Sequence, residues 1–146
     1  MTKKNLSKNK GFTLVELIVV LVILAILAAI LVPTLLGYID KARSEKDFAT
    51  AQAVRVATQA QIDELYGKGI NDVKPANLDD NAKTAIYKLV GADSANKIDG
   101  QVISIADITI TNNQIASITV QIGDKYYKYV SSTNTWAAST APTTTP

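Results

Sequence analysis

A nearly unbroken apolar run close to the N-terminus constrains this chain more than any other feature. From Leu17 to Val32 the sequence contains no polar residue, and apolar residues continue on both sides. The whole stretch exceeds the roughly 20 residues that a helix needs to cross a bilayer. One acid, Glu16, stands at the start of the run. Because a carboxylate that faces lipid costs a few kcal/mol or more, a segment that served only as an anchor would not carry it.

Four lysines and no acidic residue precede the run. Positive charges beside a membrane helix stay in the cytoplasm, so we expect a single-pass precursor in the cytoplasmic (inner) membrane with its C-terminus outside. A secretory signal peptide would place a small-residue cleavage site after its apolar core. Here the small residue, Gly11, lies before the run and no such site follows before Pro33, which disfavours ordinary secretion with loss of the segment.

The segment Lys-Gly-Phe-Thr-Leu-Val-Glu-Leu occupies residues 10–17, and the apolar run, Pro33 and Tyr38 follow it. Together these residues resemble the N-terminus of a type IV pilin precursor, with its class III signal and N-methylation motif. The resemblance is close over this part, and the remainder of the chain is similar to the family only in layout. It implies that a membrane peptidase, the prepilin peptidase, cuts between Gly11 and Phe12 and methylates the new amino terminus at Phe12.

The same resemblance gives further residues a role. Residues 1–11 would be the cleaved cytoplasmic leader and residues 12–38 the transmembrane and polymerisation helix. Glu16 would guide assembly, and Pro33 would mark a bend in the helix. Elementary chemistry supports the role of Glu16, because cleavage creates a cationic amine at Phe12 that can neutralise the Glu16 of a neighbouring subunit. The alternative is that Glu16 only reaches the lipid headgroups near the helix end.

The resemblance implies a structural pilin subunit that polymerises into a type IV pilus, an extracellular surface filament. Its partners would be further copies of itself, the prepilin peptidase, the inner-membrane pilus assembly platform and, before assembly, membrane lipid. Adhesion, twitching motility, biofilm formation and DNA uptake are roles of that family. Two alternatives stay open: a pseudopilin of a type II secretion or competence system, and a membrane-tethered binding module that never polymerises.

Composition disfavours several other functions. The chain has no Cys and no His, the residues most often used as nucleophile, general base and transition-metal ligand. No phosphate-binding loop or catalytic motif occurs in the sequence. We therefore expect no enzyme, no cofactor and no metal. Asn96, Asp99 and Asp107 could be imagined as calcium ligands, but no Asp-x-Asx-x-Asx-Gly loop contains them.

The net charge of +2 changes once the leader is removed. Fifteen basic residues face thirteen acidic ones, but four of the basic residues belong to the leader, so the mature chain would have eleven and a balance of −2. Nucleic acid is therefore not expected as a direct partner. Four aromatic residues near the C-terminus could form a stacking surface for DNA or glycan, but sheet core and cross-strand pairing are the favoured interpretation: Tyr126, Tyr127, Tyr129 and Trp136.

The rest of the chain predicts an extracytoplasmic globular domain over residues 39–138. Its helix should continue over 40–66 and end at Gly67 and Gly69, since no Gly or Pro interrupts it. Small apolar residues recur at helical spacing, and we expect this alanine stripe to contact a sheet: Ala42, Ala49, Ala53, Val56, Ala57 and Ala60. A belt of mixed charge favours either a solvated face or charge pairing between subunits: Asp40, Lys41, Arg43, Glu45, Lys46 and Asp47.

Between helix and sheet, a connector over 67–100 contains a second predicted helix, capped by Asn77 or Asp79 and stopped by Gly91. A Ser, Thr, Ala and Pro tail over 139–146 should be disordered. The predicted fold class is α+β. It consists of a long N-terminal helix packed against a C-terminal antiparallel β-meander of three to four strands.

Over residues 101–138 the apolar period changes to two, which predicts strands at 102–110, 115–122 and 125–130. Gly123-Asp124 is a hairpin turn signal. Its register pairs Ile122 with Lys125, Val120 with Tyr127, and Ile118 with Tyr129. A bulge near Asp107 would reconcile two apolar phases in the first of these strands.

Overall fold

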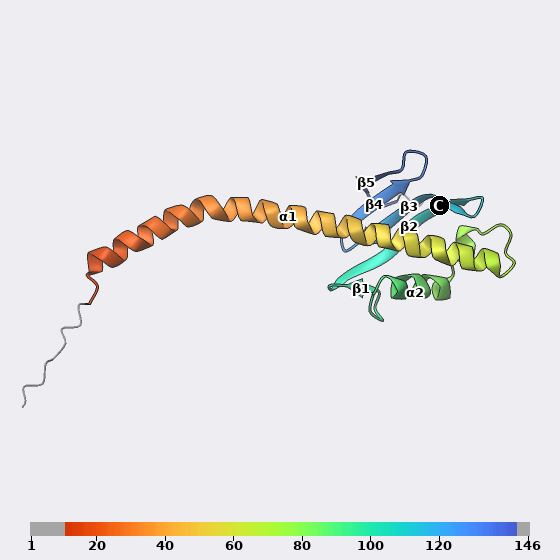
Figure 1. Ribbon diagram of the computed structural model, residues 1–146, viewed down its shortest axis with the longest axis horizontal. Coiled ribbons are helices and arrows are strands. Elements are labelled where there is room, and N and C mark those ends of the chain that lie inside the picture. The colour runs from red at the N-terminus through yellow and green to blue at the C-terminus, as the bar shows by residue number, and fades with distance from the viewer. Residues whose placement is uncertain (1–10, 143–146) are drawn as a thin grey trace, which may run out of the picture. The chain divides into compact units, whose positions relative to one another are not determined.

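The computed structural model describes residues 11–142 and has an α+β architecture (Figure 1). One long helix comes first, two short helices follow, and an antiparallel sheet ends the chain. The elements are α1 (Leu14–Gly67), η1 (Pro75–Asn77), α2 (Asp80–Leu89), β1 (Lys97–Ile98), β2 (Gln101–Thr111), β3 (Gln114–Ile122), β4 (Lys125–Val130) and β5 (Thr135–Ser139). The predicted fold class is confirmed, although the sheet has five strands rather than three or four.

Contacts divide the chain into two compact units, and the boundary between them lies inside α1, after Ala42. The first unit contains the N-terminal part of α1. Every large apolar side chain in it from Phe12 to Leu36 is at least half exposed. Among the described residues, α1 is the one helix whose length and composition allow it to cross a membrane. The first unit therefore has no core of its own.

The helix continues without interruption through Pro33. Proline lacks the N–H that would bond the carbonyl of Ala29, so the sequence predicts a weak point at this position. A bent helix and a straight helix can both remain helical on either side of a proline. The bend at Pro33 therefore stays a prediction.

The second unit begins at Arg43 and contains the sheet, whose strands follow one another in the order β1-β2-β3-β4-β5. The pairing of β3 with β4 has the predicted register, with Val120 opposite Tyr127 and Ile118 opposite Tyr129. The predicted bulge is also present, as a register shift between Ile105 and Asp107 in β2. Turn chemistry and alternating apolar residues were therefore sufficient to fix the central hairpin.

Two short edge strands were not predicted. β1 has two residues, and β5 carries small side chains around a single tryptophan, so neither gives a clear alternating pattern. β5 corrects the prediction for the tail, because Ser139 pairs with Tyr126 and belongs to the sheet. The last four residues of the predicted tail lie outside the described residues.

The sheet packs on a different face of α1 from the one predicted. Of the alanine stripe only Ala57 is buried, and Val56 is 54% exposed. The buried face of α1 consists of Asp47, Ala51, Val54, Ala57, Thr58, Gln61 and Ile62. Burying a valine or an isoleucine stabilises the fold more than burying an alanine does. Val54 and Ile62 therefore determine which face of α1 packs on the sheet. The prediction was wrong because polar residues interrupt this face in the sequence.

The helix α2 begins as predicted, because the Asp79 carboxylate accepts the backbone N–H of Ala82 at 2.8 Å. Its buried residues include Ile86 and Tyr87. The Tyr87 hydroxyl accepts the backbone N–H of Ile105 at 3.0 Å, beside the bulge in β2. Burial raises the pKa of Tyr87. α2 therefore supplies a hydrogen-bond acceptor to the edge of β2 where β1 has ended.

Candidate functional site

The predicted cleavage junction lies in a short non-helical segment that precedes α1. Gly11, Phe12 and Thr13 have no regular secondary structure, and Phe12 is 91% exposed. A Cβ added at Gly11 would meet no atom within 4 Å. The helix was expected from Phe12, and it begins two residues later at Leu14. The bond between Gly11 and Phe12, where cleavage is predicted, is therefore outside the helical hydrogen-bond ladder.

Thr13 and Glu16 close the first turn of α1 with three hydrogen bonds. The backbone N–H and the hydroxyl of Thr13 both donate to Glu16 Oε2, at 2.8 and 2.9 Å. In return, the backbone N–H of Glu16 donates to Thr13 Oγ1 at 3.2 Å. This reciprocal arrangement is a capping box, with Thr13 at the N-cap and Glu16 three residues later. It satisfies N–H groups that have no partner within a helix.

The same arrangement favours a negative charge at this position. The N-terminal end of a helix carries a partial positive charge, so it stabilises the Glu16 carboxylate electrostatically. Both hydrogen bonds to the carboxylate end on Oε2. Among residues 11–142, no hydrogen bond ends on Oε1. One oxygen is therefore held by the chain itself, while the other stays available to a cation from outside.

Of the predicted site residues, Gly11 and Phe12 lie just before the start of α1, and Glu16 lies in its first turn. Pro33 lies in the same helix, seventeen residues after Glu16, which corresponds to roughly 25 Å along the axis. Thr13 was not predicted as a site residue. The pattern Thr-Leu-Val-Glu before an apolar run is the sequence signal of a capping box and could have identified it.

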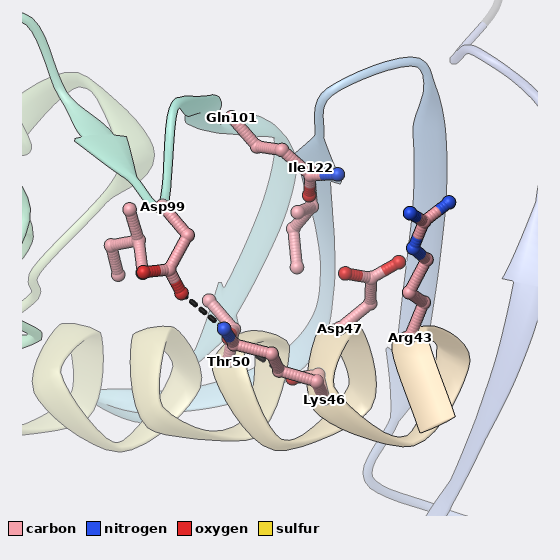
Figure 2. A pocket seen from close by; sticks show the side chains of 8 residues that line it. Arg43, Lys46, Asp47, Thr50, Asp99, Gln101 and Ile122 are labelled. Carbon is pink, nitrogen blue, oxygen red and sulfur yellow. Dashed lines mark hydrogen bonds and ion pairs between the residues drawn. The ribbon is translucent and has the colours of Figure 1, made fainter. Parts of the chain in front are cut away.

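A second cluster of charged residues lies where the second unit begins (Figure 2). Asp47 is 7% exposed, and its Oδ2 accepts the hydroxyl of Tyr127 at 2.9 Å. Lys125 Nζ lies 3.7 Å from the same oxygen. Burial, with the hydrogen bond and the charge of Asp47, raises the pKa of Tyr127 to about 12. Asp47 was predicted to belong to an exposed belt, and this is corrected because it joins α1 to β4 instead.

A cavity of about 410 Å³ adjoins this cluster and is lined by Arg43, Lys46, Asp47, Thr50, Ile98, Asp99, Gln101 and Ile122. Lys46 forms an exposed ion pair with Asp99. Asp107 lines a different cavity. The imagined calcium ligands therefore do not line one cavity. Within the described part of the chain, no group of three or more acidic residues is placed to hold a metal ion.

The aromatic residues of the sheet contact α1 and one another. Phe48 meets the Tyr127 ring edge-on, with centroids 4.8 Å apart. The Arg55 guanidinium lies 4.5 Å above the ring of Tyr129, and Trp136 Nε1 donates to Gln52 Oε1 at 2.7 Å. This supports the interpretation of these side chains as structural residues that hold the sheet to the helix.

Comparison with known families finds a match at the N-terminus. Residues 6–32 match the family described as the prokaryotic N-terminal methylation motif, the class III signal of type IV pilins. The match includes the Gly11–Phe12 junction, the capping box and the whole apolar run from Leu17 to Val32. It indicates a type IV pilin-like N-terminus, of the kind shared by pilins and pseudopilins, and it fits a membrane-anchored protein. No curated protein and no solved structure matches the chain.

Proposed function

We propose that this chain is the structural subunit of a type IV pilus. It is made as a single-pass precursor with its basic leader in the cytoplasm and its sheet outside. The prepilin peptidase cuts between Gly11 and Phe12 and methylates Phe12. The inner-membrane assembly platform then adds the subunit to a helical surface filament.

The observation that carries this proposal is the contrast between an uncovered apolar helix and a folded unit that fills its own core. Every large apolar side chain from Phe12 to Leu36 is at least half exposed. A helix that is apolar on all sides is stable in lipid or among other apolar helices. Lipid covers this helix in the precursor. In a filament, the helices of neighbouring copies take the place of lipid.

Glu16 favours assembly over simple anchoring. Its carboxylate is exposed on the apolar part of α1, where it would face lipid in an isolated subunit at considerable cost. Cleavage produces a cationic amine at Phe12. When that amine meets the Glu16 of a neighbouring subunit, the two charges neutralise each other in a medium where each alone is expensive. A tethered binding module would gain nothing from this acid.

The test is expression of the full chain in cells that contain a prepilin peptidase and an assembly platform. We expect mass spectrometry to find a methylated Phe12 as the first residue, and electron microscopy to find long surface filaments. Gly11→Leu is the matched control, because a side chain at position 11 has open space around it and should block only cleavage. It should leave an uncut membrane precursor and no filaments.

Three results would contradict the proposal. An intact Met1 in the wild-type protein, or a cut after Pro33, would show that cleavage between Gly11 and Phe12 does not occur. Complete processing without long surface filaments would assign the chain to a pseudopilin of a secretion or competence system. Adhesion or motility measurements become meaningful only after filaments have been seen.

A further inference from the structure

Thr13 immediately precedes α1, and the proposed function gives it no role. We infer that Thr13 is a positioning residue for filament assembly: its capping box holds one oxygen of Glu16 in place before a neighbouring subunit arrives. The inference rests on the proposed function, in which Glu16 receives the Phe12 amine of another copy.

The geometry requires a hydroxyl group at position 13. Thr13 Oγ1 accepts the Glu16 N–H at 3.2 Å and donates its own proton to Glu16 Oε2 at 2.9 Å. One atom therefore acts as acceptor and donor toward the same residue. Among the side chains favoured at an N-cap, only serine and threonine provide such an atom.

The two bonds to Oε2 restrict a side chain that would otherwise be flexible. A free glutamate loses rotamer freedom when it forms an ion pair, and this loss weakens the pairing. Here the restriction is already present in the single subunit. Within residues 11–142 no hydrogen bond ends on Oε1, so this oxygen can receive an amine while Oε2 remains bonded to Thr13. A group that is fixed before binding loses less freedom on binding, which favours assembly.

Surroundings of low polarity make the capping box more important than it would be in water. Backbone N–H groups in lipid cannot bond to water, so each unsatisfied group costs several kcal/mol. The box satisfies the N–H groups of both Thr13 and Glu16. Losing the Thr13 hydroxyl would leave the Glu16 N–H without this acceptor and would release the carboxylate from one of its two donors.

The first experiment compares filament yields of full-length variants in the same cells, with mass spectrometry of Phe12 to confirm processing. Thr13→Val keeps the shape of the side chain but removes the hydroxyl, and should lose most filaments while still being cut and methylated. Thr13→Ser should restore the wild-type yield. Thr34→Val is the matched control, because Thr34 is a second hydroxyl in the same apolar helix, bonded to the Leu31 carbonyl at 2.8 Å. It should assemble normally.

A fourth variant separates positioning from a merely structural start of the helix. Asparagine caps helices about as well as serine, but its acceptor oxygen cannot also donate to the carboxylate. Thr13→Asn should therefore keep the helix start and still reduce filament yield. Wild-type filament yield from Thr13→Val or Thr13→Asn would overturn the inference. So would failure of the peptidase to cut Thr13→Val, which would make Thr13 a recognition residue for cleavage.

The second experiment tests the capping box in the single subunit and does not depend on filaments. Amide hydrogen exchange is measured by NMR on the processed chain, residues 12–146, in detergent micelles. Thr13→Val should speed exchange of the Glu16 amide by about fivefold, the typical effect of a lost helix cap, while Thr13→Asn should not. Unchanged exchange in Thr13→Val would overturn the inference. If the wild-type chain forms no filaments, the proposed function fails instead, and this exchange result still decides whether the box exists.

Discussion

The two parts of α1 belong to one continuous helix but differ completely in what covers them. From Leu14 to Leu36 every large apolar side chain is at least half exposed, whereas Ala51, Val54 and Ile62 are fully buried. The first part is apolar on all sides, while the second has one buried face that includes polar residues. Helix formation is therefore separate from burial here. The second part folds with its own sheet, and the first depends on lipid or on other subunits.

The largest effect should come from Glu16, in the part that lacks a core. We expect Glu16→Ala and Glu16→Gln both to abolish filaments and to leave membrane insertion intact. Glutamine still serves as the third residue of a capping box, so a loss in Glu16→Gln reports the charge and not the helix start. Filament yield in sheared surface fractions is the measurement. Glu64→Gln is the matched control, since Glu64 is exposed and pairs with Lys68. Normal filaments from Glu16→Gln would show that assembly does not need the negative charge of Glu16.

A pair of valines in the second part of α1 tests where its buried face lies. Val54 is 0% exposed and Val56 is 54% exposed. We expect Val54→Ala to lower the free energy of unfolding by about 2 kcal/mol, through lost burial and a small cavity. Val56→Ala should change it by less than about 0.5 kcal/mol. Urea unfolding of the full chain in micelles, followed by fluorescence of the single tryptophan, measures both. A larger effect of Val56→Ala than of Val54→Ala would mean that the alanine stripe, as first predicted, packs on the sheet.

The buried hydrogen bond between Asp47 and Tyr127 should have a smaller effect. Tyr127→Phe removes the hydroxyl that donates to Asp47 at 2.9 Å and leaves a buried carboxylate with one partner fewer. We expect a loss of about 1.5 kcal/mol in the free energy of unfolding, since Lys125 still lies near the carboxylate. Tyr126→Phe is the control, because the Tyr126 hydroxyl makes no hydrogen bond to any residue that the structure describes. Equal stability of the two variants would contradict a stabilising role for this bond.

The same contact predicts how stability depends on pH. The pKa of Tyr127 is raised to about 12 from its ordinary value of 10.0, mainly by burial and then by Asp47. The folded state therefore favours the protonated phenol. Its contribution is fully present below about pH 10 and is lost as pH rises toward 12. Urea unfolding between pH 9 and 12 should show this fall, and Tyr127→Phe should reduce the slope. Tyr87, whose pKa burial also raises, should account for part of what remains.

The contrast between the two parts also explains what the sequence could and could not predict. The apolar run and the hairpin at Gly123-Asp124 are local patterns, so the long helix and the register of β3 with β4 followed from them. The Thr13–Glu16 capping box spans four consecutive residues, so the sequence alone could have predicted it. The hydrogen bond between Tyr127 and Asp47 joins residues 80 positions apart, so no local sequence pattern predicts it. The buried face of α1 was missed for the same reason, since its polar members find their partners only in the folded chain.

The smallest effect should come from Lys46, the neighbour of Asp47 in the sequence. Lys46 forms an ion pair with Asp99, but both side chains are more than half exposed. Water and salt screen such a pair, so it contributes about 0–1 kcal/mol. Asp99 has a φ of 50°, which asparagine tolerates well, so Asp99→Asn removes the charge with little strain. We expect the free energy of unfolding to change by less than about 1 kcal/mol, and by even less in high salt. A larger loss, comparable to that of Tyr127→Phe, would contradict this expectation. It would mean that the exposed Lys46–Asp99 pair contributes as much to stability as the buried Asp47 carboxylate does.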